Sequence, residues 1–163
     1  MMIASSQLYP GDPEIQRISI TIPSSLYFQS GVRDFTLEMV RNLTGLPDQW
    51  AFRFQTIVDE LCNNAIEHGS HPGEEIALTF YTKPTQWLEV VVEDNGTGPK
   101  TIDAQALEAM IAEQKKLKDD EIHGLRGRGL ARIVARWTDE LDFKPRPGGG
   151  MLVRARKNMQ QLC

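Results

Sequence analysis

The chain has 163 residues, of which 40% are hydrophobic and 25% charged, and this is the size and balance of one ordinary folded domain of about 100–200 residues. The two cysteines, Cys62 and Cys163, lie about a hundred positions apart, which excludes a disulfide framework or a cysteine-built zinc site. A formal charge of −4 disfavours direct binding of nucleic acid, and no stretch approaches the roughly 18–20 apolar residues that cross a membrane, so we expect a cytoplasmic protein.

The first predicted elements are a strand and a helix. Residues 1–16 mix Ser, Gln, Pro and Gly without apolar periodicity, so we expect a frayed lead-in. Isoleucines alternate with polar residues at 17–22, which is the pattern of a half-buried strand. Apolar residues then recur at threes and fours over residues 26–43, which predicts a helix with Ser24 or Ser25 as its N-cap.

A second helix and a β-hairpin are predicted next. The helix opens at residues 47–48 and runs to Gly69, since glycine commonly follows the end of a helix. After a Gly/Pro break, residues 76–81 and 87–92 have the composition of two strands, and the Lys-Pro-Thr segment between them favours a turn.

The C-terminal part is predicted to hold two helices, at 104–117 and 130–137, and two strands, at 140–143 and 151–156. The whole order of elements predicts one domain over residues 17–157 and a short tail at 158–163. Strands that neighbour each other in sequence favour a mixed, mostly antiparallel sheet with helices on one face. The predicted fold class is therefore α+β, a two-layer α/β sandwich.

The second helix carries the first group of candidate functional residues. At about 3.6 residues per turn, Glu60, Asn64 and His68 fall along one side of it, at the edge of the apolar face. A carboxylate there can accept a proton, and an amide oxygen one turn later can bind a hard cation such as Mg²⁺. The alternative from this helix alone is a solvated face that ends in a capping His68.

A second group follows the strand at 87–92. Asp94 comes just after that strand, and Gly96 and Gly98 follow it, so an acceptor stands beside backbone that a flat ligand can approach closely. The same segment contains Asn95-Gly96, one of the strongest turn signals, so a plain turn explains this loop equally well.

A third group of residues precedes the helix expected to end at Trp137. Gly124, Gly127 and Gly129 would leave backbone N–H groups free at the positive end of the helix dipole, which suits a phosphate. Arginines between these glycines, at positions 126 and 128, add charged donors. The spacing matches neither the dinucleotide fingerprint nor the phosphate-binding loop, and the alternative is a flexible basic loop.

Taken in chain order, the three groups resemble the ATP-binding fold of the GHKL-type ATPases, which include DNA gyrase and sensor histidine kinases. A Glu-to-Asn box, an Asp-x-Gly-x-Gly box and a Gly-rich box follow one another across residues 17–157. The short chain and the segment Gly-Arg-Gly-Leu-Ala-Arg-Ile at 127–133 look most like the anti-sigma-factor serine kinases of bacterial partner-switching systems. The resemblance implies a Bergerat-type fold with ATP and Mg²⁺ as ligands.

The resemblance also implies a role for each candidate residue. Glu60 would be the general base toward a seryl hydroxyl, and Asn64 would bind Mg²⁺. Asp94 would accept a hydrogen bond from the exocyclic amine of adenine, and Gly96 and Gly98 would let the base and ribose approach. The third group would form a lid over the triphosphate, with one arginine offsetting charge on the transferred phosphoryl group. The lid residues are Gly124, Gly127, Arg128 and Gly129.

The implied function is an ATP-dependent serine/threonine protein kinase that acts as an anti-sigma regulatory factor. Its partners would be a sigma factor or similar regulator and an antagonist protein with a phosphorylatable serine, and the resemblance also allows a homodimer. No direct contact with nucleic acid or membrane is expected. The chain departs from the family in two respects: Met151 follows the last glycine turn, where relatives often have Thr, and the first lid glycine is more isolated than usual.

Three alternatives stay open at this point. A non-catalytic, nucleotide-gated protein-binding module and a stand-alone histidine-kinase catalytic domain would both keep the fold. A small α/β regulator whose glycine loops are only turns would bind no nucleotide.

Overall fold

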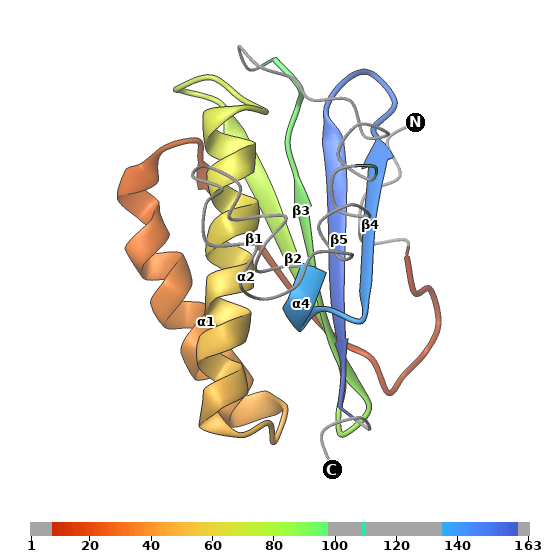
Figure 1. Ribbon diagram of the computed structural model, residues 1–163. Helices are drawn as coiled ribbons and strands as arrows, with labels where there is room; N and C mark the ends of the chain where they lie inside the picture. The colour runs from red at the N-terminus through yellow and green to blue at the C-terminus, as the bar shows by residue number, and fades with distance from the viewer. Residues whose placement is uncertain (1–7, 98–108, 110–134, 160–163) are drawn as a thin grey trace.

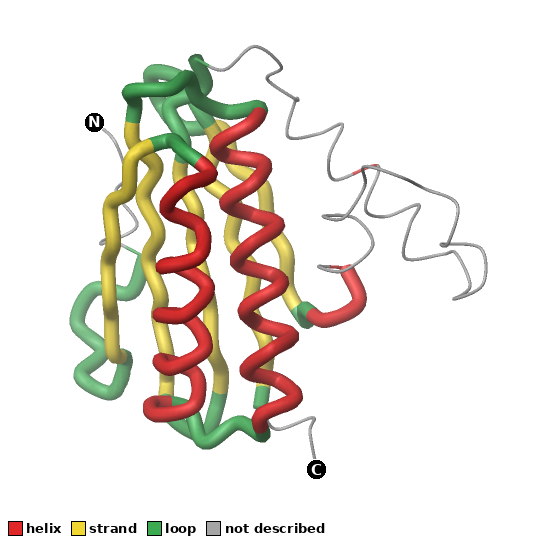
Figure 2. Tube along the Cα trace, turned by 90° about the vertical axis from the view of Figure 1, so that its left-hand side faces the viewer, coloured by secondary structure: helices red, strands yellow, loops and turns green. Residues whose placement is uncertain are grey.

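The computed structural model describes residues 8–97, 109 and 135–159, and these form two layers (Figure 1). One layer is a five-stranded sheet, and the other is a pair of long helices that cover one face of it (Figure 2). The predicted α+β two-layer sandwich is confirmed.

The sheet consists of β1 (Gln16–Pro23), β2 (Glu75–Lys83), β3 (Trp87–Glu93), β4 (Glu140–Pro145) and β5 (Met151–Asn158). Their order across the sheet is β1-β2-β3-β5-β4, and each described pair of neighbours is antiparallel. β3 lies in the centre, with Val90 opposite Phe80 of β2 and Ala155 of β5. All five predicted strands are therefore present, each slightly longer than its sequence pattern indicated.

The described helices are α1 (Gln29–Leu43), α2 (Asp48–Glu67) and the short α4 (Ala135–Trp137). A 3-10 turn, Leu26–Phe28, precedes α1, and the Ser25 hydroxyl accepts a hydrogen bond from the Tyr27 N–H at 3.3 Å. The helix predicted from residue 26 thus begins three residues later, because the serine cap first closes a tighter turn. No helix within the described ranges is long and apolar enough to cross a membrane.

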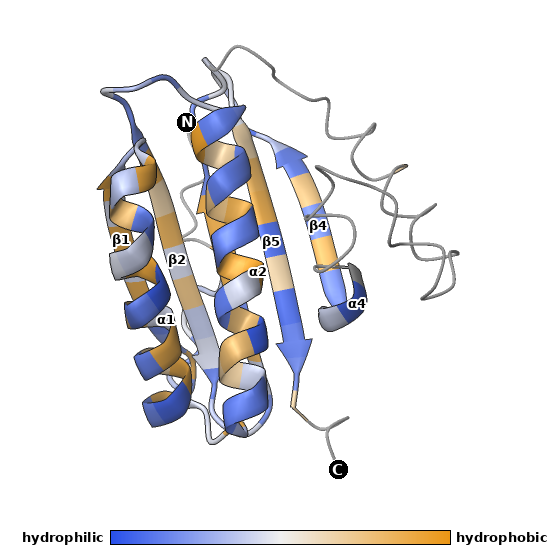
Figure 3. Cartoon of the chain, turned by 60° about the vertical axis from the view of Figure 1, so that its left-hand side comes forward, coloured by the Kyte–Doolittle hydropathy of each residue, from blue (hydrophilic) through white to orange (hydrophobic). Residues whose placement is uncertain are grey.

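The core lies between the two long helices and the sheet. The apolar residues of α2 recur at threes and fours, and Phe54, Ile57, Leu61 and Ala65 are each no more than 3% exposed. Figure 3 shows hydrophobic and hydrophilic residues alternating along both helices, as expected for helices with one buried face. This packing fixes α2 across the sheet and brings its C-terminal end toward the end of β3.

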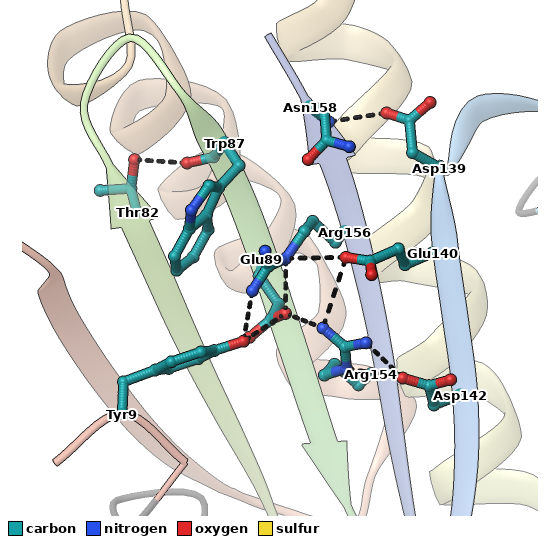
Figure 4. Close-up of polar contacts among 10 residues, drawn as sticks. All are labelled: Tyr9, Thr82, Trp87, Glu89, Asp139, Glu140, Asp142, Arg154, Arg156 and Asn158. Carbon is teal, nitrogen blue, oxygen red and sulfur yellow. Dashed lines mark hydrogen bonds and ion pairs between the residues drawn. The ribbon is translucent and has the colours of Figure 1, made fainter.

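The other face of the sheet carries a network of polar contacts around Glu89, which is fully buried (Figure 4). One Glu89 carboxylate oxygen accepts from Arg154 at 2.5 Å and from Arg156 at 3.0 Å, and the Tyr9 hydroxyl donates to the other at 2.7 Å. The Arg156 guanidinium lies 3.9 Å from the centre of the Trp87 ring. The buried carboxylate is therefore compensated by two positive groups and a hydroxyl, as a buried charge requires.

Tyr9 also fixes the N-terminal segment on this face. Its ring packs against Tyr81 and Trp87, with ring centres 5.0 and 5.3 Å away. Burial and the hydrogen bond to Glu89 raise the pKa of Tyr9, so its hydroxyl remains a donor. Composition favours a frayed lead-in, but in the described residues 8–15 these aromatic contacts hold the chain on the sheet. The domain limits at residues 17 and 157 stay a prediction.

Candidate functional site

Three segments meet at one end of the sheet: the end of α2, the loop after β3 and the turn between β4 and β5 (Figure 1). One close approach is between Gly69 and Asp94. A Cβ placed on Gly69 would lie closer than 3.0 Å to both carboxylate oxygens of Asp94. Glycine is thus required at this position for space, and the helix carrying Glu60 and Asn64 is in direct contact with the Asp94 carboxylate through its C-terminal end.

Asp94 is held by backbone donors through one of its carboxylate oxygens. Its Oδ1 atom accepts from the Gly96 N–H at 2.9 Å and from the Met151 N–H at 3.2 Å. Its Oδ2 atom accepts no hydrogen bond from any residue within the described ranges, and it therefore has lone pairs for a ligand. Burial raises the pKa of Asp94, while the two backbone donors and the Arg146 guanidinium oppose that rise.

The loop after β3 packs backbone to backbone against the β4–β5 turn. Gly96 and Gly150 both have positive φ angles, 72° and 96°, and a Cβ on either one would collide with the backbone of the other segment. The Asp94 N–H donates to the Met151 carbonyl at 3.1 Å, which continues the β3–β5 pairing into the site. Met151, which stands where relatives often have Thr, therefore contributes its backbone to Asp94.

The same loop is also tied to the segment between α2 and β2. Thr97 donates through its hydroxyl to Glu74 at 2.6 Å, and the Asn95 amide donates to the same carboxylate. These hydrogen bonds lower the pKa of Glu74, the one from Thr97 having the largest effect. The Ser24 N–H donates to the Glu74 carbonyl at 2.7 Å, so the end of β1 supports this segment in turn.

Among the polar residues of α2, Asp59 and Asn63 contact α1, whereas Glu60 and Asn64 do not. Asp59 lies 3.6 Å from Arg33 of α1, and Asn63 accepts from the Gln29 amide at 2.6 Å. Glu60 and Asn64 are half-buried, and within the described ranges their side chains have no hydrogen-bond or ion-pair partner. The sequence pattern placed Glu60 and Asn64 on one side of the helix, but it did not indicate that Asp59 and Asn63 would contact α1.

The surroundings of Glu60 suit a proton acceptor. Burial raises the pKa of Glu60, and the negative charges of Asp59 and Glu67 raise it further. A carboxylate with a pKa closer to neutral is a better general base than an ordinary glutamate. Glu60 thus has the environment expected of the role that the resemblance implied.

Asn64 is the described residue best suited to hold a divalent cation. Its backbone carbonyl accepts from the His68 and Gly69 N–H groups at 3.0 and 3.2 Å, which leaves the side-chain amide for a ligand. Mg²⁺ usually keeps several waters and takes one or two protein oxygens together with substrate phosphates, so a single amide oxygen fits it. The described ranges contain no cluster of three or more His, Cys, Asp or Glu residues that would hold a metal by itself.

The three polar groups follow one another along the helix axis. With a rise of about 1.5 Å per residue, Asn64 lies about 8 Å and Glu60 about 14 Å before Gly69, which touches Asp94. The carboxylate of Asp94, the amide of Asn64 and the carboxylate of Glu60, in this order, have the spacing that suits an elongated ligand.

Some of the predicted site residues lie outside the described part of the chain. These are Gly98 and the lid residues Gly124, Gly127, Arg128 and Gly129, together with the helix expected at 104–117. The structure also adds residues that the sequence pattern did not single out for the site. They are Gly69, Glu74, Arg146 and Gly150, each of which contacts a segment distant in sequence.

Comparison with known families agrees with this geometry. A family model described as the histidine kinase-like ATPase domain matches residues 23–157. The chain belongs to this family. The matched range contains Glu60, Asn64, Asp94 and Gly96, and the resemblance to a GHKL-type ATPase fold is confirmed. No curated protein matches the chain.

Membership of the histidine kinase-like ATPase family identifies the ligand class of the site. The domain is an ATP-binding domain, so ATP is the ligand expected between α2 and the loop after β3. The Oδ2 atom of Asp94, to which no described residue donates, suits the exocyclic amine of adenine, since that amine is a donor and the carboxylate is an acceptor.

Proposed function

We propose that this histidine kinase-like ATPase domain is an ATP-dependent serine/threonine protein kinase and an anti-sigma regulatory factor, which phosphorylates a serine of an antagonist protein. The observation that carries the proposal is the state of Glu60. Its carboxylate is half-buried, has no hydrogen-bond or ion-pair partner among the described residues, and lies on the same side of α2 as the amide of Asn64. A domain that only bound nucleotide would have no need of such a group.

The chemistry requires a base beside the attacking hydroxyl. Glu60 would accept the serine proton while the serine oxygen bonds to the γ-phosphorus and the bond from that phosphorus to ADP breaks. Mg²⁺, when bound, would neutralise charge on the phosphates, and Asn64 is the residue that would hold it. Asp94 would hold the adenine end, so that the triphosphate extends along α2 toward Glu60.

The partner-switching role rests on the resemblance to anti-sigma-factor kinases. In this proposal the domain holds a sigma factor or similar regulator and releases it when the antagonist competes, and phosphorylation of the antagonist ends that competition. A homodimer is part of the same proposal. The outer edge of β1, an edge strand of the described sheet, is the place for such a contact, since Ile18 and Ile20 pack against the core.

The experiment that tests the proposal compares two neighbouring carboxylates. Purified protein is incubated with labelled ATP, Mg²⁺ and a co-encoded candidate antagonist, and acid-stable phosphoserine is measured. Glu60→Gln is expected to lower the rate about a hundredfold or more, which is the size of a general-base contribution. Asp59→Asn is the matched control, because Asp59 is paired with Arg33, and it is expected to keep most of the activity.

Two other outcomes would favour the alternatives. Binding of partner and nucleotide by the wild type without any phosphotransfer would indicate a nucleotide-gated binding module. An acid-labile phosphoprotein would indicate transfer to a histidine and hence a stand-alone histidine-kinase catalytic domain.

A further inference from the structure

Arg146, in the turn between β4 and β5, contacts both residues at the end of β3. One of its guanidinium nitrogens donates to the backbone carbonyl of Asp94, and another lies 3.8 Å from a carboxylate oxygen of Glu93. The side chains of Arg146 and Glu93 are only 16% and 6% exposed. Burying such a pair costs free energy of desolvation, so its presence is weak evidence for a purely stabilising role.

We infer that Arg146, with Glu93, is a positioning residue for the nucleotide base, which fixes the place and the charge of Asp94. This inference rests on the proposed binding of adenine at Asp94. The backbone of Arg146 closes its own turn, with its N–H donating to the Gly150 carbonyl at 2.9 Å. Since Gly150 packs directly on the backbone of Asp94 and Asn95, one arginine connects the turn, the end of β3 and the base acceptor.

The charge of Arg146 acts on the same carboxylate. Within the described ranges, the charged or titratable groups around Asp94 are Arg146 from the turn, Glu93 on β3, Glu74 through its contact with Asn95, and His68 beside Gly69. Burial raises the pKa of Asp94, and Arg146 is the charged neighbour that opposes the rise. Asp94 must be ionised for Oδ1 to accept from the backbone N–H groups while Oδ2 accepts from the amine, so Arg146 widens the pH range over which the base is held.

The test is the pH dependence of ATP affinity, measured by titration calorimetry between about pH 5 and pH 8. Arg146→Met is expected to weaken ATP binding roughly tenfold at neutral pH, the equivalent of one charge-assisted hydrogen bond, and to move the acidic midpoint to higher pH. Arg146→Lys keeps the charge and is expected to return the midpoint toward the wild-type value.

Glu93→Gln provides an independent variant that keeps the arginine. It removes a negative neighbour of Asp94, so the midpoint is expected to move to lower pH, opposite to Arg146→Met. General damage to the turn would not shift the two midpoints in opposite directions. If Arg146→Met does not fold, Arg146→Lys and Glu93→Gln carry the test. The titration of ATP itself is common to all variants and cancels in the comparison.

Arg41→Met is the matched control. Arg41 pairs with Asp48 at 3.2 Å near the junction of α1 and α2, away from the three segments of the site, and its loss should leave the pH profile unchanged. A wild-type midpoint in Arg146→Met, or shifts of Arg146→Met and Glu93→Gln in the same direction, would overturn this inference alone. Absence of ATP binding by the wild-type protein would overturn the proposed function and this inference together.

Discussion

At the residue scale, Gly69 leaves no space for a side chain beside the Asp94 carboxylate. Replacing it by alanine would place a methyl group against the Asp94 carboxylate, so the Asp94 side chain, the loop after β3 or the end of α2 must move. We expect Gly69→Ala to lower the free energy of unfolding by about 1–3 kcal/mol, the usual cost of overpacking, and to weaken ATP binding. Chemical denaturation and ATP titration measure the two effects.

Gly31→Ala is the control for this prediction. Gly31 lies in α1 with no atom within 4 Å of the position of a Cβ, so alanine there should raise the free energy of unfolding by up to about 1 kcal/mol through its helix propensity. If the two substitutions changed the free energy of unfolding and the ATP affinity equally, the contact between Gly69 and Asp94 would contribute to neither.

We expect Glu60 to set the pH dependence of the proposed phosphotransfer. Because burial and the neighbouring carboxylates raise its pKa, the group loses its proton at a higher pH than an ordinary glutamate. The acidic limb of the rate profile should therefore lie above the usual range of a glutamate. Glu67→Gln removes one of those neighbours and should move this limb to lower pH, as measured by single-turnover kinetics. A limb that does not move would argue against Glu60 as the base.

At the scale of elements, two adjacent residues of α2 have different surroundings: Asn63 contacts α1, whereas Asn64 has no described side-chain partner. Asn63→Ala should cost about 1 kcal/mol of stability, because it breaks the hydrogen bond to Gln29, and it should leave ATP binding intact. Asn64→Ala should have the reverse effect. Its stability should be near that of the wild type, but Mg²⁺ should no longer increase its affinity for ATP. Titrations with and without Mg²⁺ distinguish them, and a Mg²⁺ effect retained in Asn64→Ala would contradict the assignment.

At the scale of the whole molecule, the two faces of the sheet have different tasks. One face packs against α1 and α2, and α2 carries residues of the site, whereas the face carrying Glu89 packs against the N-terminal segment. We expect Tyr9→Ala to lower the free energy of unfolding by roughly 1–3 kcal/mol, because it removes ring contacts and a hydrogen bond to a buried carboxylate, without changing ATP affinity.

Tyr27→Ala is the matched control for Tyr9. Tyr27 is 82% exposed, so its replacement should change stability by less than about 0.5 kcal/mol. A loss of stability no larger for Tyr9→Ala than for Tyr27→Ala would mean that the N-terminal segment is not part of the folded domain.

The elements that repeat a local pattern could be predicted from the sequence. The spacing of apolar residues along α2 specified the helix and the sides on which Glu60 and Asn64 lie, and alternation specified β1. The acid just after β3 was found in the same way, since a buried strand followed by Asp and two glycines is a local signal.

Contacts between distant segments could not be predicted in this way. Gly69 has the local pattern of a helix stop, but its role depends on Asp94, 25 positions later by the numbering. Arg146 lies in a turn whose sequence favours exposure, and only the β3–β5 pairing brings it to Glu93. The frayed appearance of residues 8–15 likewise gave no sign that one tyrosine would reach a buried carboxylate.

The central claim, that ATP binds where α2, the loop after β3 and the β4–β5 turn meet, is tested most directly at Asp94. The measurement is calorimetric titration of Mg-ATP into the wild-type protein and into Asp94→Asn. We predict binding by the wild type and a loss of about tenfold to a hundredfold in Asp94→Asn. The one amide oxygen of Asn would accept from the Gly96 and Met151 N–H groups, as Oδ1 does now, and the amide NH2 would then meet the adenine amine, donor against donor. Equal affinity of the two proteins, or no binding by the wild type, would contradict the claim.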